Sequence, residues 1–149
     1  MKNISIVVLL VFYFTTVAYS KEPILFPISN IQVKSDSLSK IELKRLFTLE
    51  SNRWPDGTKV RILLLKRPNE YEFFLKTYLG LTPARYNDII NKKIASGRGE
   101  VPISVKTNLE MVTAVSEIPG SLGYIGEKRF IVYFESELKV LTIKEEVKK

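Results

Sequence analysis

The chain has 149 residues, no His, no Cys and a formal net charge of +7. Without His or Cys, the sequence excludes Ser-His-Asp triads, Cys-His dyads and the usual zinc sites. No paired-carboxylate motif marks another catalytic centre, so we expect a protein that is not an enzyme and uses no cofactor or metal. The positive charge favours anionic partners.

The N-terminus has the three parts of a cleavable signal peptide. Lys2 supplies a positive start, residues 4–17 are uncharged and mostly apolar, and Ala18-Tyr19-Ser20 places small residues before a cut after Ser20. The apolar run is shorter than the roughly 20 residues that span a bilayer. We therefore expect residues 1–20 to be removed, and residues 21–149 to form one periplasmic or secreted domain. No Cys lies near the cut, so we expect no lipid anchor.

Export limits the candidate partners. We expect a small phosphate-like oxyanion, a membrane surface or a periplasmic protein, and no nucleic acid. Because disulfides are not available, the stability of the exported domain must come from a packed core.

The first elements of this domain are a strand and a helix. Residues 24–33 are rich in branched apolar side chains, and Pro27 favours an edge or first strand over a central one. Ser39 and Glu42 have the spacing of a capping box, which predicts a helix of roughly ten residues. Trp54-Pro55-Asp56-Gly57 predicts a turn. Residues 60–65 are nearly all apolar, which is typical of a strand buried on both faces of a parallel or mixed sheet.

Helices dominate the middle of the chain. Apolar residues at helical spacing predict a helix over residues 70–79 that ends at Gly80, and helical spacing also favours a core role for the aromatic residues there. Thr82-Pro83 predicts the start of a second helix, which ends before Gly97. Residues 97–102 follow as an irregular loop.

The last third is expected to return to the sheet. Thr107 or Asn108 caps another helix, and Pro119-Gly120 ends it. Short strands are expected over residues 122–125, 130–134 and 138–143, followed by a frayed basic tail over residues 144–149. Strands alternating with helices in this order indicate an α/β domain with one sheet covered by helices.

Four segments in fixed order resemble one family: residues 38–47, residues 54–65, the loop 97–102 and residues 118–125. The set is similar to the phosphate-type substrate-binding proteins of bacterial ABC transporters, and in particular to short relatives built from about one lobe of the type II periplasmic binding fold. The resemblance implies a mixed sheet flanked by helices and a non-enzymatic binding function. It also implies that a second copy or a partner protein would be needed to enclose a small ligand.

The resemblance implies a ligand site after the strand at residues 60–65, where the family typically has an Arg followed by a Ser-Gly-Thr triplet at a helix start. Arg67 is present, but Pro68-Asn69-Glu70-Tyr71 replaces the triplet. Pro68 offers no N–H, and Glu70 would repel phosphate. Arg67, Asn69 and Arg98 are therefore the candidate ligand-binding residues.

Each candidate also has a purely structural interpretation. Arg67 could pair with Glu70 or Glu72, Asn69 could cap a helix beginning at Glu70, and Arg98 could be a surface residue between two loop glycines. Two functions stay open on these grounds. One is a binding module for a small oxyanion, and the other is a periplasmic interaction module that keeps the fold without the ligand.

Overall fold

The computed structural model describes residues 21–145, which form a mixed sheet with helices on both faces. The expected signal peptide, residues 1–20, and the end of the expected tail, residues 146–149, lie outside this range. Five strands form a sheet in the order β4-β3-β5-β1-β6, and β2 and β7 form a second, two-stranded sheet. The strands are β1 (Phe26–Asn30), β2 (Ser37–Ser39), β3 (Arg61–Leu65), β4 (Ile103–Val105), β5 (Ser121–Ile125), β6 (Leu138–Val140) and β7 (Thr142–Lys144).

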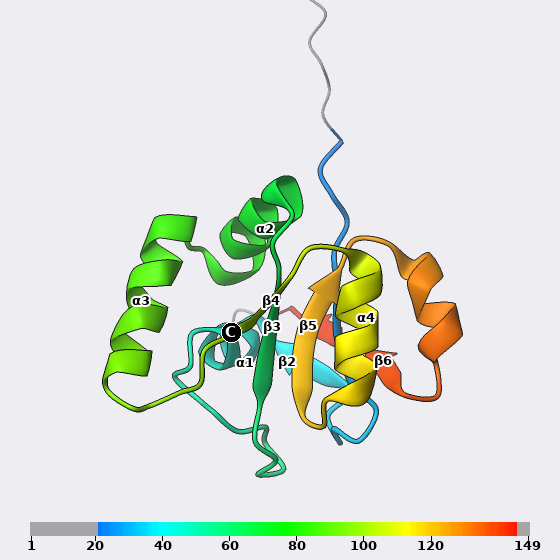
Figure 1. The fold of residues 1–149 in the computed structure, drawn as a ribbon, viewed down its shortest axis with the longest axis horizontal. Helices are drawn as coiled ribbons and strands as arrows, with labels where there is room; N and C mark the ends of the chain where they lie inside the picture. The colour runs from blue at the N-terminus through cyan, green and yellow to red at the C-terminus, as the bar shows by residue number, and fades with distance from the viewer. Residues whose placement is uncertain (1–20, 146–149) are drawn as a thin grey trace, which may run out of the picture.

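The helices lie in layers around the main sheet (Figure 1). α4 (Asn108–Glu117) covers the front face, and α1 (Lys40–Phe47) lies behind the sheet. α2 (Pro68–Phe74) continues into a π-helical turn, η1 (Leu75–Leu79), and α3 (Pro83–Ala95) follows it. The predicted α/β class is confirmed. Within residues 21–145, no helix is both long and apolar enough to cross a membrane.

Local sequence signals fix most helix ends as predicted. The Ser39 hydroxyl accepts a hydrogen bond from the Glu42 N–H at 3.2 Å, and the Glu42 carboxylate accepts one from the Ser39 N–H at 2.8 Å. This capping box starts α1, and Thr82 caps α3. Gly80 and Gly97 have φ of 66° and 68°, the left-handed conformation that ends helices.

Pro27 favoured an edge or first strand over a central one. The segment is the first strand of the described chain, but it does not lie at an edge, because β1 lies between β5 and β6. Pro27 pairs with Tyr124 of β5, and its carbonyl accepts a hydrogen bond from the N–H of Leu141 at 2.9 Å. The N–H and C=O of a residue in an antiparallel pair point to the same side. The missing N–H of Pro27 therefore faces the chain just beyond the end of β6, where an interior strand tolerates proline.

The strand expected over residues 130–134 is also wrong. This segment belongs to a 3₁₀ helix, η2 (Lys128–Phe134). Phe130, Ile131 and Phe134 are half-buried against the core, whereas Val132 and Tyr133 are exposed. This spacing suits a helical turn better than alternation along a strand.

Other strand boundaries differ from the predicted ones by a few residues. β4 was not predicted, because three residues after Pro102 are too short for a clear pattern. The strand expected over residues 138–143 is divided into β6 and β7 at the buried Leu141. Lys144 ends β7, so the frayed tail does not begin there.

Aromatic rings join the layer of α1 and α2 to the sheet. The rings of Phe74 and Tyr124 are stacked, with centroids 3.8 Å apart and planes 8° apart. Phe47 packs against both, at centroid distances of 4.7 Å and 6.2 Å. All three side chains are buried. Phe74 therefore has the core role expected for the aromatic residues of its helix, and Tyr71, Phe73 and Tyr78 are half-buried against the core. On the opposite face, Met111 of α4 packs against Gly123 of β5.

Hydrogen bonds connect the loop before β3 to the loop before β5. Trp54 is 2% exposed, and its indole N–H donates to the carbonyl of Gly120 at 2.8 Å. The same carbonyl accepts the N–H of Arg61 at 3.2 Å. Gly120 has φ of 73°, and a Cβ there would collide with the carbonyl oxygen of Lys59.

Gly120→Ala is expected to destabilise the protein much more than Gly97→Ala. Both positions have left-handed backbone, for which a non-glycine residue costs about 1–2 kcal/mol. Gly97 has open space around its missing Cβ, so Gly97→Ala measures the backbone cost alone. The added collision should raise the loss for Gly120→Ala to about 3 kcal/mol or more in urea unfolding. Equal losses in the two variants would contradict this packing.

Candidate functional site

The carboxyl ends of β3, β4 and β5 meet at one edge of the sheet, because β3 is parallel to both of its neighbours. Ligands of open α/β sheets gather at such an edge. Lys66-Arg67 leave β3 here, Lys106-Thr107 leave β4 and Gly126-Glu127 leave β5. α2 and α4 begin at this edge, so their positive dipole ends are directed toward it.

Arg67 occupies the N-cap position of α2, and Pro68 is the first helical residue. The Nε of Arg67 lies 3.3 Å from Oε1 of Glu70, and a terminal guanidinium nitrogen of Arg67 lies 3.7 Å from Oε1 of Glu127. We call these three side chains, Arg67, Glu70 and Glu127, the carboxyl corner. The Arg67 side chain is 41% exposed, so solvent reaches the guanidinium despite both carboxylates.

Asn108 holds Glu127 in place. Its amide nitrogen donates to Oε1 of Glu127 at 3.1 Å, and its amide oxygen accepts the N–H of Gly126 at 2.9 Å. Arg129 contacts the other carboxylate oxygen of Glu127 at 2.6 Å. Asn108 is 2% exposed, so these bonds fasten the chain after β5 to the start of α4 in a fixed geometry.

The start of α4 satisfies part of its own hydrogen-bonding capacity. The Thr107 hydroxyl accepts the N–H of Glu110 at 3.1 Å, and the Glu110 carboxylate accepts the N–H of Lys106 at 2.8 Å. An anion at this helix start would compete with these side chains for backbone donors.

Basic residues nevertheless outnumber acidic ones along this edge. The acidic residues are Glu70, Glu110 and Glu127, and the basic ones are Lys66, Arg67, Lys106, Lys128 and Arg129. Within residues 21–145, no cluster of three or more carboxylates is placed to hold a metal ion. The edge therefore has the charge to attract an anion.

Asn69 does not cap α2, contrary to the structural interpretation of its sequence context. The helix begins at Pro68 rather than Glu70, so Asn69 lies inside the first turn and is exposed. Proline is well suited to the first helical position, because the N–H that it lacks has no partner within the helix. The pairing of Arg67 with Glu70 that the sequence suggested is present.

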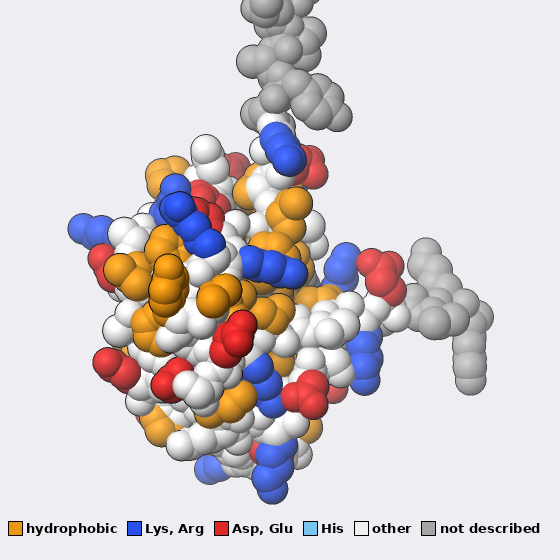
Figure 2. Space-filling model, turned by 90° about the vertical axis from the view of Figure 1, so that its right-hand side faces the viewer, with side chains coloured by type: hydrophobic (Ala, Val, Ile, Leu, Met, Phe, Trp, Pro, Cys, Tyr) orange, Lys and Arg blue, Asp and Glu red, His pale blue; other side chains and the backbone are white. Residues whose placement is uncertain are grey.

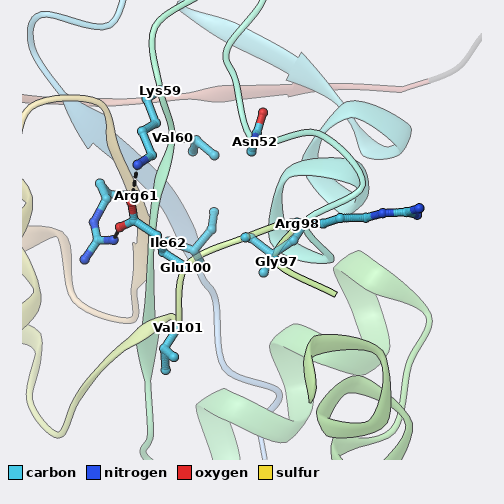
Figure 3. A pocket seen from close by; sticks show the side chains of 11 residues that line it. Asn52, Lys59, Val60, Arg61, Ile62, Gly97, Arg98, Glu100 and Val101 are labelled. Carbon is cyan, nitrogen blue, oxygen red and sulfur yellow. Dashed lines mark hydrogen bonds and ion pairs between the residues drawn. The ribbon is translucent and has the colours of Figure 1, made fainter. Parts of the chain in front are cut away.

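Arg98 lies at the opposite end of β3 from Arg67. It lines a pocket of about 270 Å³ beside the amino ends of β3 and β4. In Figure 3 the side chain of Arg98 points away from Lys59, Arg61 and Glu100. The Glu100 carboxylate forms ion pairs with both Lys59 and Arg61. The five residues of β3 span roughly 16 Å. A phosphate-sized ligand therefore cannot contact both Arg67 and Arg98.

Sequence reasoning did not find Glu127 or Asn108. Glu127 follows a predicted strand, as Arg67 does, but a carboxylate is not an expected contact for an anion. Asn108 was identified as a possible helix cap, whereas the structure uses Thr107 as the cap and buries Asn108. For Glu127, its position just after a predicted strand was the available signal, whereas no predicted strand directly precedes Asn108.

Tyr124 forms a buried hydrogen bond to the end of β3 at this edge. Its hydroxyl donates to the carbonyl of Leu65, the last residue of β3, at 3.1 Å. Burial is the main reason that the pKa of Tyr124 is raised well above its usual 10.0, and nearby Tyr71 adds to the effect.

We expect Tyr124→Phe to reduce the loss of stability at alkaline pH. In the unfolded chain Tyr124 releases its proton as the pH rises past about 10, whereas the buried phenol keeps it. The unfolded state then binds fewer protons, so stability falls as the pH rises above 10. Urea unfolding at pH 8 and pH 11 should show a smaller difference for the variant than for the unaltered protein.

At pH 8 the variant should lose about 1 kcal/mol with the hydrogen bond to Leu65. Tyr133→Phe is the matched control, because Tyr133 is 81% exposed. An unchanged pH dependence in Tyr124→Phe would contradict the burial of a neutral phenol.

Comparison with solved structures identifies the fold. The chain is similar to PstS from Borrelia burgdorferi, with a TM-score of 0.61 and 20% identity over 85% of this chain and 49% of that one. For an ABC-type phosphate transport receptor from Vibrio cholerae the TM-score is 0.58, with 15% identity over 83% and 47%. For a possible phosphate binding protein from Planctomyces limnophilus it is 0.54, with 16% identity over 81% and 41%.

These likenesses confirm the predicted resemblance in fold. The chain spans about half the length of the solved proteins that it matches. No protein-family model and no curated protein matches the sequence. The comparisons therefore establish the fold of this chain, and the ligands of the solved proteins are properties of those proteins alone.

Proposed function

We propose that this chain is an exported, non-enzymatic binding protein that uses a single lobe of the phosphate-binding fold to hold a small oxyanion at its carboxyl corner. The observation that carries the proposal is the position of Arg67, which is half-exposed at the carboxyl end of a central parallel strand. The solved proteins of this fold are described as phosphate-binding or phosphate-transport proteins.

The geometry of the Arg67 contacts supports exchange for an external anion. Strong charge-assisted hydrogen bonds between nitrogen and oxygen are about 2.7–2.9 Å long. The contacts of Arg67 with Glu70 and Glu127 are longer, at 3.3 Å and 3.7 Å. An incoming oxyanion could therefore form shorter bonds to the guanidinium than either carboxylate does.

The other candidate residues have unequal roles in this proposal. Asn69 lies in the first turn of α2 and is exposed, so its amide could donate to an anion beside Arg67. Arg98 belongs to the separate pocket at the amino edge, where an anion would have to be bound independently. We therefore assign the oxyanion to Arg67 and Asn69 first.

A specific observation favours a second function, that of an interaction module without a small ligand. Glu70 and Glu127 already lie beside Arg67, and the Ser-Gly-Thr triplet is absent. Desolvating phosphate against two carboxylates is unfavourable. In this alternative the corner is a structural ion-pair network, and the surface of the domain contacts a periplasmic protein or a membrane.

Titration calorimetry of residues 21–149 with phosphate and sulfate at low ionic strength tests the proposal. Arg67→Ala should weaken binding by about 10- to 100-fold, because it removes charge-assisted hydrogen bonds worth about 1.5–3 kcal/mol. Arg85→Ala is the matched control, since Arg85 is exposed on α3 and forms no ion pair with a residue of the carboxyl corner in the described part of the chain. The absence of heat with every anion would reject the small-ligand function and leave the interaction module.

Glu127→Gln should have the opposite effect. It removes a competing negative charge at nearly constant size, and we expect anion affinity to rise roughly fivefold, or by about 1 kcal/mol. The same calorimetric titration measures this change. Equal affinities of Glu127→Gln and the unaltered protein would show that the anion does not meet the corner.

Export has its own test. Expression of the full chain in a bacterium with a periplasm should yield a protein whose N-terminal residue is Lys21, as measured by intact mass. Ala18→Glu should keep the precursor uncut, because a small side chain is needed three residues before the cleavage point. An uncut unaltered chain in the cytoplasm would contradict the proposed location.

A further inference from the structure

η2 presents an apolar surface to solvent. Val132 is 65% exposed and Tyr133 is 81% exposed, while Phe130, Ile131 and Phe134 of the same helix pack against the core. Figure 2 views the molecule from the side on which η2 lies in Figure 1, and apolar side chains gather there, bordered by side chains of both charges. Val132 and Tyr133 are adjacent in sequence and point away from the core, so they form one patch.

The charges at the two ends of η2 have opposite signs. Lys128 and Arg129 stand at its start, and Glu135 and Glu137 follow its end. All four residues are exposed. In the described part of the chain, Lys128, Glu135 and Glu137 form no ion pair, whereas Arg129 contacts Glu127. Glu127, the N-cap residue of η2, leaves the start of this helix with one excess positive charge. The surface is thus weakly basic at one end, apolar in the middle and acidic at the other.

This arrangement matches an inverted copy of itself. A two-fold axis through a surface patch places each end of one copy against the opposite end of the other. The axis would therefore set Lys128 and Arg129 of one copy against Glu135 and Glu137 of the second. Val132 and Tyr133 of the two copies would meet at the centre, where water is excluded first.

We propose that η2 and its flanking charges form a self-complementary interface, and that the occupant of this surface is a second copy of the same chain. The acidic end disfavours an anionic membrane as the occupant, because Glu135 and Glu137 would be repelled by it. A patch built on two exposed side chains is small for an interface, so we expect weak association, with a dissociation constant on the order of tens of micromolar.

Sedimentation velocity of residues 21–149 across a concentration series tests the apolar centre. The unaltered protein should dimerise, and Val132→Ser should weaken dimerisation at least tenfold. Val101→Ser is a matched control, because Val101 is also 65% exposed but lies in the loop before β4. Dimerisation that survives Val132→Ser, or a monomer at millimolar concentration, would overturn the proposal.

Charge reversal tests the inverted pairing itself. Lys128→Glu in one chain and the double change Glu135→Lys, Glu137→Lys in another should each weaken self-association, since like charges then meet at both ends. Mixing the two variants should restore a dimer that contains one chain of each kind, detected by differing fluorescent labels. Failure of the mixture to associate would overturn the arrangement, as would monomers that bind phosphatidylglycerol vesicles instead.

These substitutions leave Arg67, Asn69, Glu70 and Glu127 unaltered, but Lys128 is one of the basic residues along the edge that carries the carboxyl corner. Val132→Ser therefore tests self-association apart from anion binding, and Lys128→Glu is also titrated with phosphate. All the substitutions lie on exposed side chains, and retention of the far-ultraviolet circular dichroism spectrum shows that each variant is folded. The unaltered protein is examined with and without phosphate to keep the two proposals separate.

Discussion

The parallel pairing of β3 with β4 and β5 is the constraint on which the rest of the molecule depends. Parallel strands cannot be joined by tight turns, so each needs a helical crossover, and the crossovers supply the layers on both sides of the sheet. The same geometry brings three strand ends and the starts of α2 and α4 to one edge. Arg67, Asn108 and Glu127 are widely separated in sequence but are neighbours because of this pairing.

Within that edge, the chain supplies its own counter-charges. Glu127 contacts Arg67 and Arg129, while buried Asn108 fixes its position. A buried amide that holds a surface carboxylate is a costly arrangement unless both amide groups are paired, and here both are. The contacts of the chain's own residues therefore suffice to order the corner. The contacts of Arg67 with Glu70 and Glu127 are long, so its guanidinium can still form further hydrogen bonds. The contact of Arg129 with Glu127 is short, so the guanidinium of Arg129 is already engaged.

Sequence alone predicted the features that depend on neighbouring residues. The Ser39 and Glu42 capping box, the Gly80 and Gly97 helix ends and the buried β3 follow from local chemistry. The predictions failed where tertiary contacts determine the local structure. Pro27 is tolerated inside the sheet because β6 ends beside it. Residues 130–134 form a helical turn because only one side of this segment packs against the core. The candidate Arg67 was placed at the expected edge. Its relation to Glu127 depends on strand order, which no local pattern contains.

The strand order also determines when the sheet can form. β1 is near the start of the described chain, but both of its partners, β5 and β6, come from the last third, and β2 waits for β7 in the same way. Such long-range contacts slow folding, because loop closure must precede the gain from pairing. A nascent chain lacks the partners of its first two strands until residues 121–144 have been synthesised. Late closure of this kind is compatible with the proposed export, in which a chain is threaded unfolded through a membrane before it acquires its final shape.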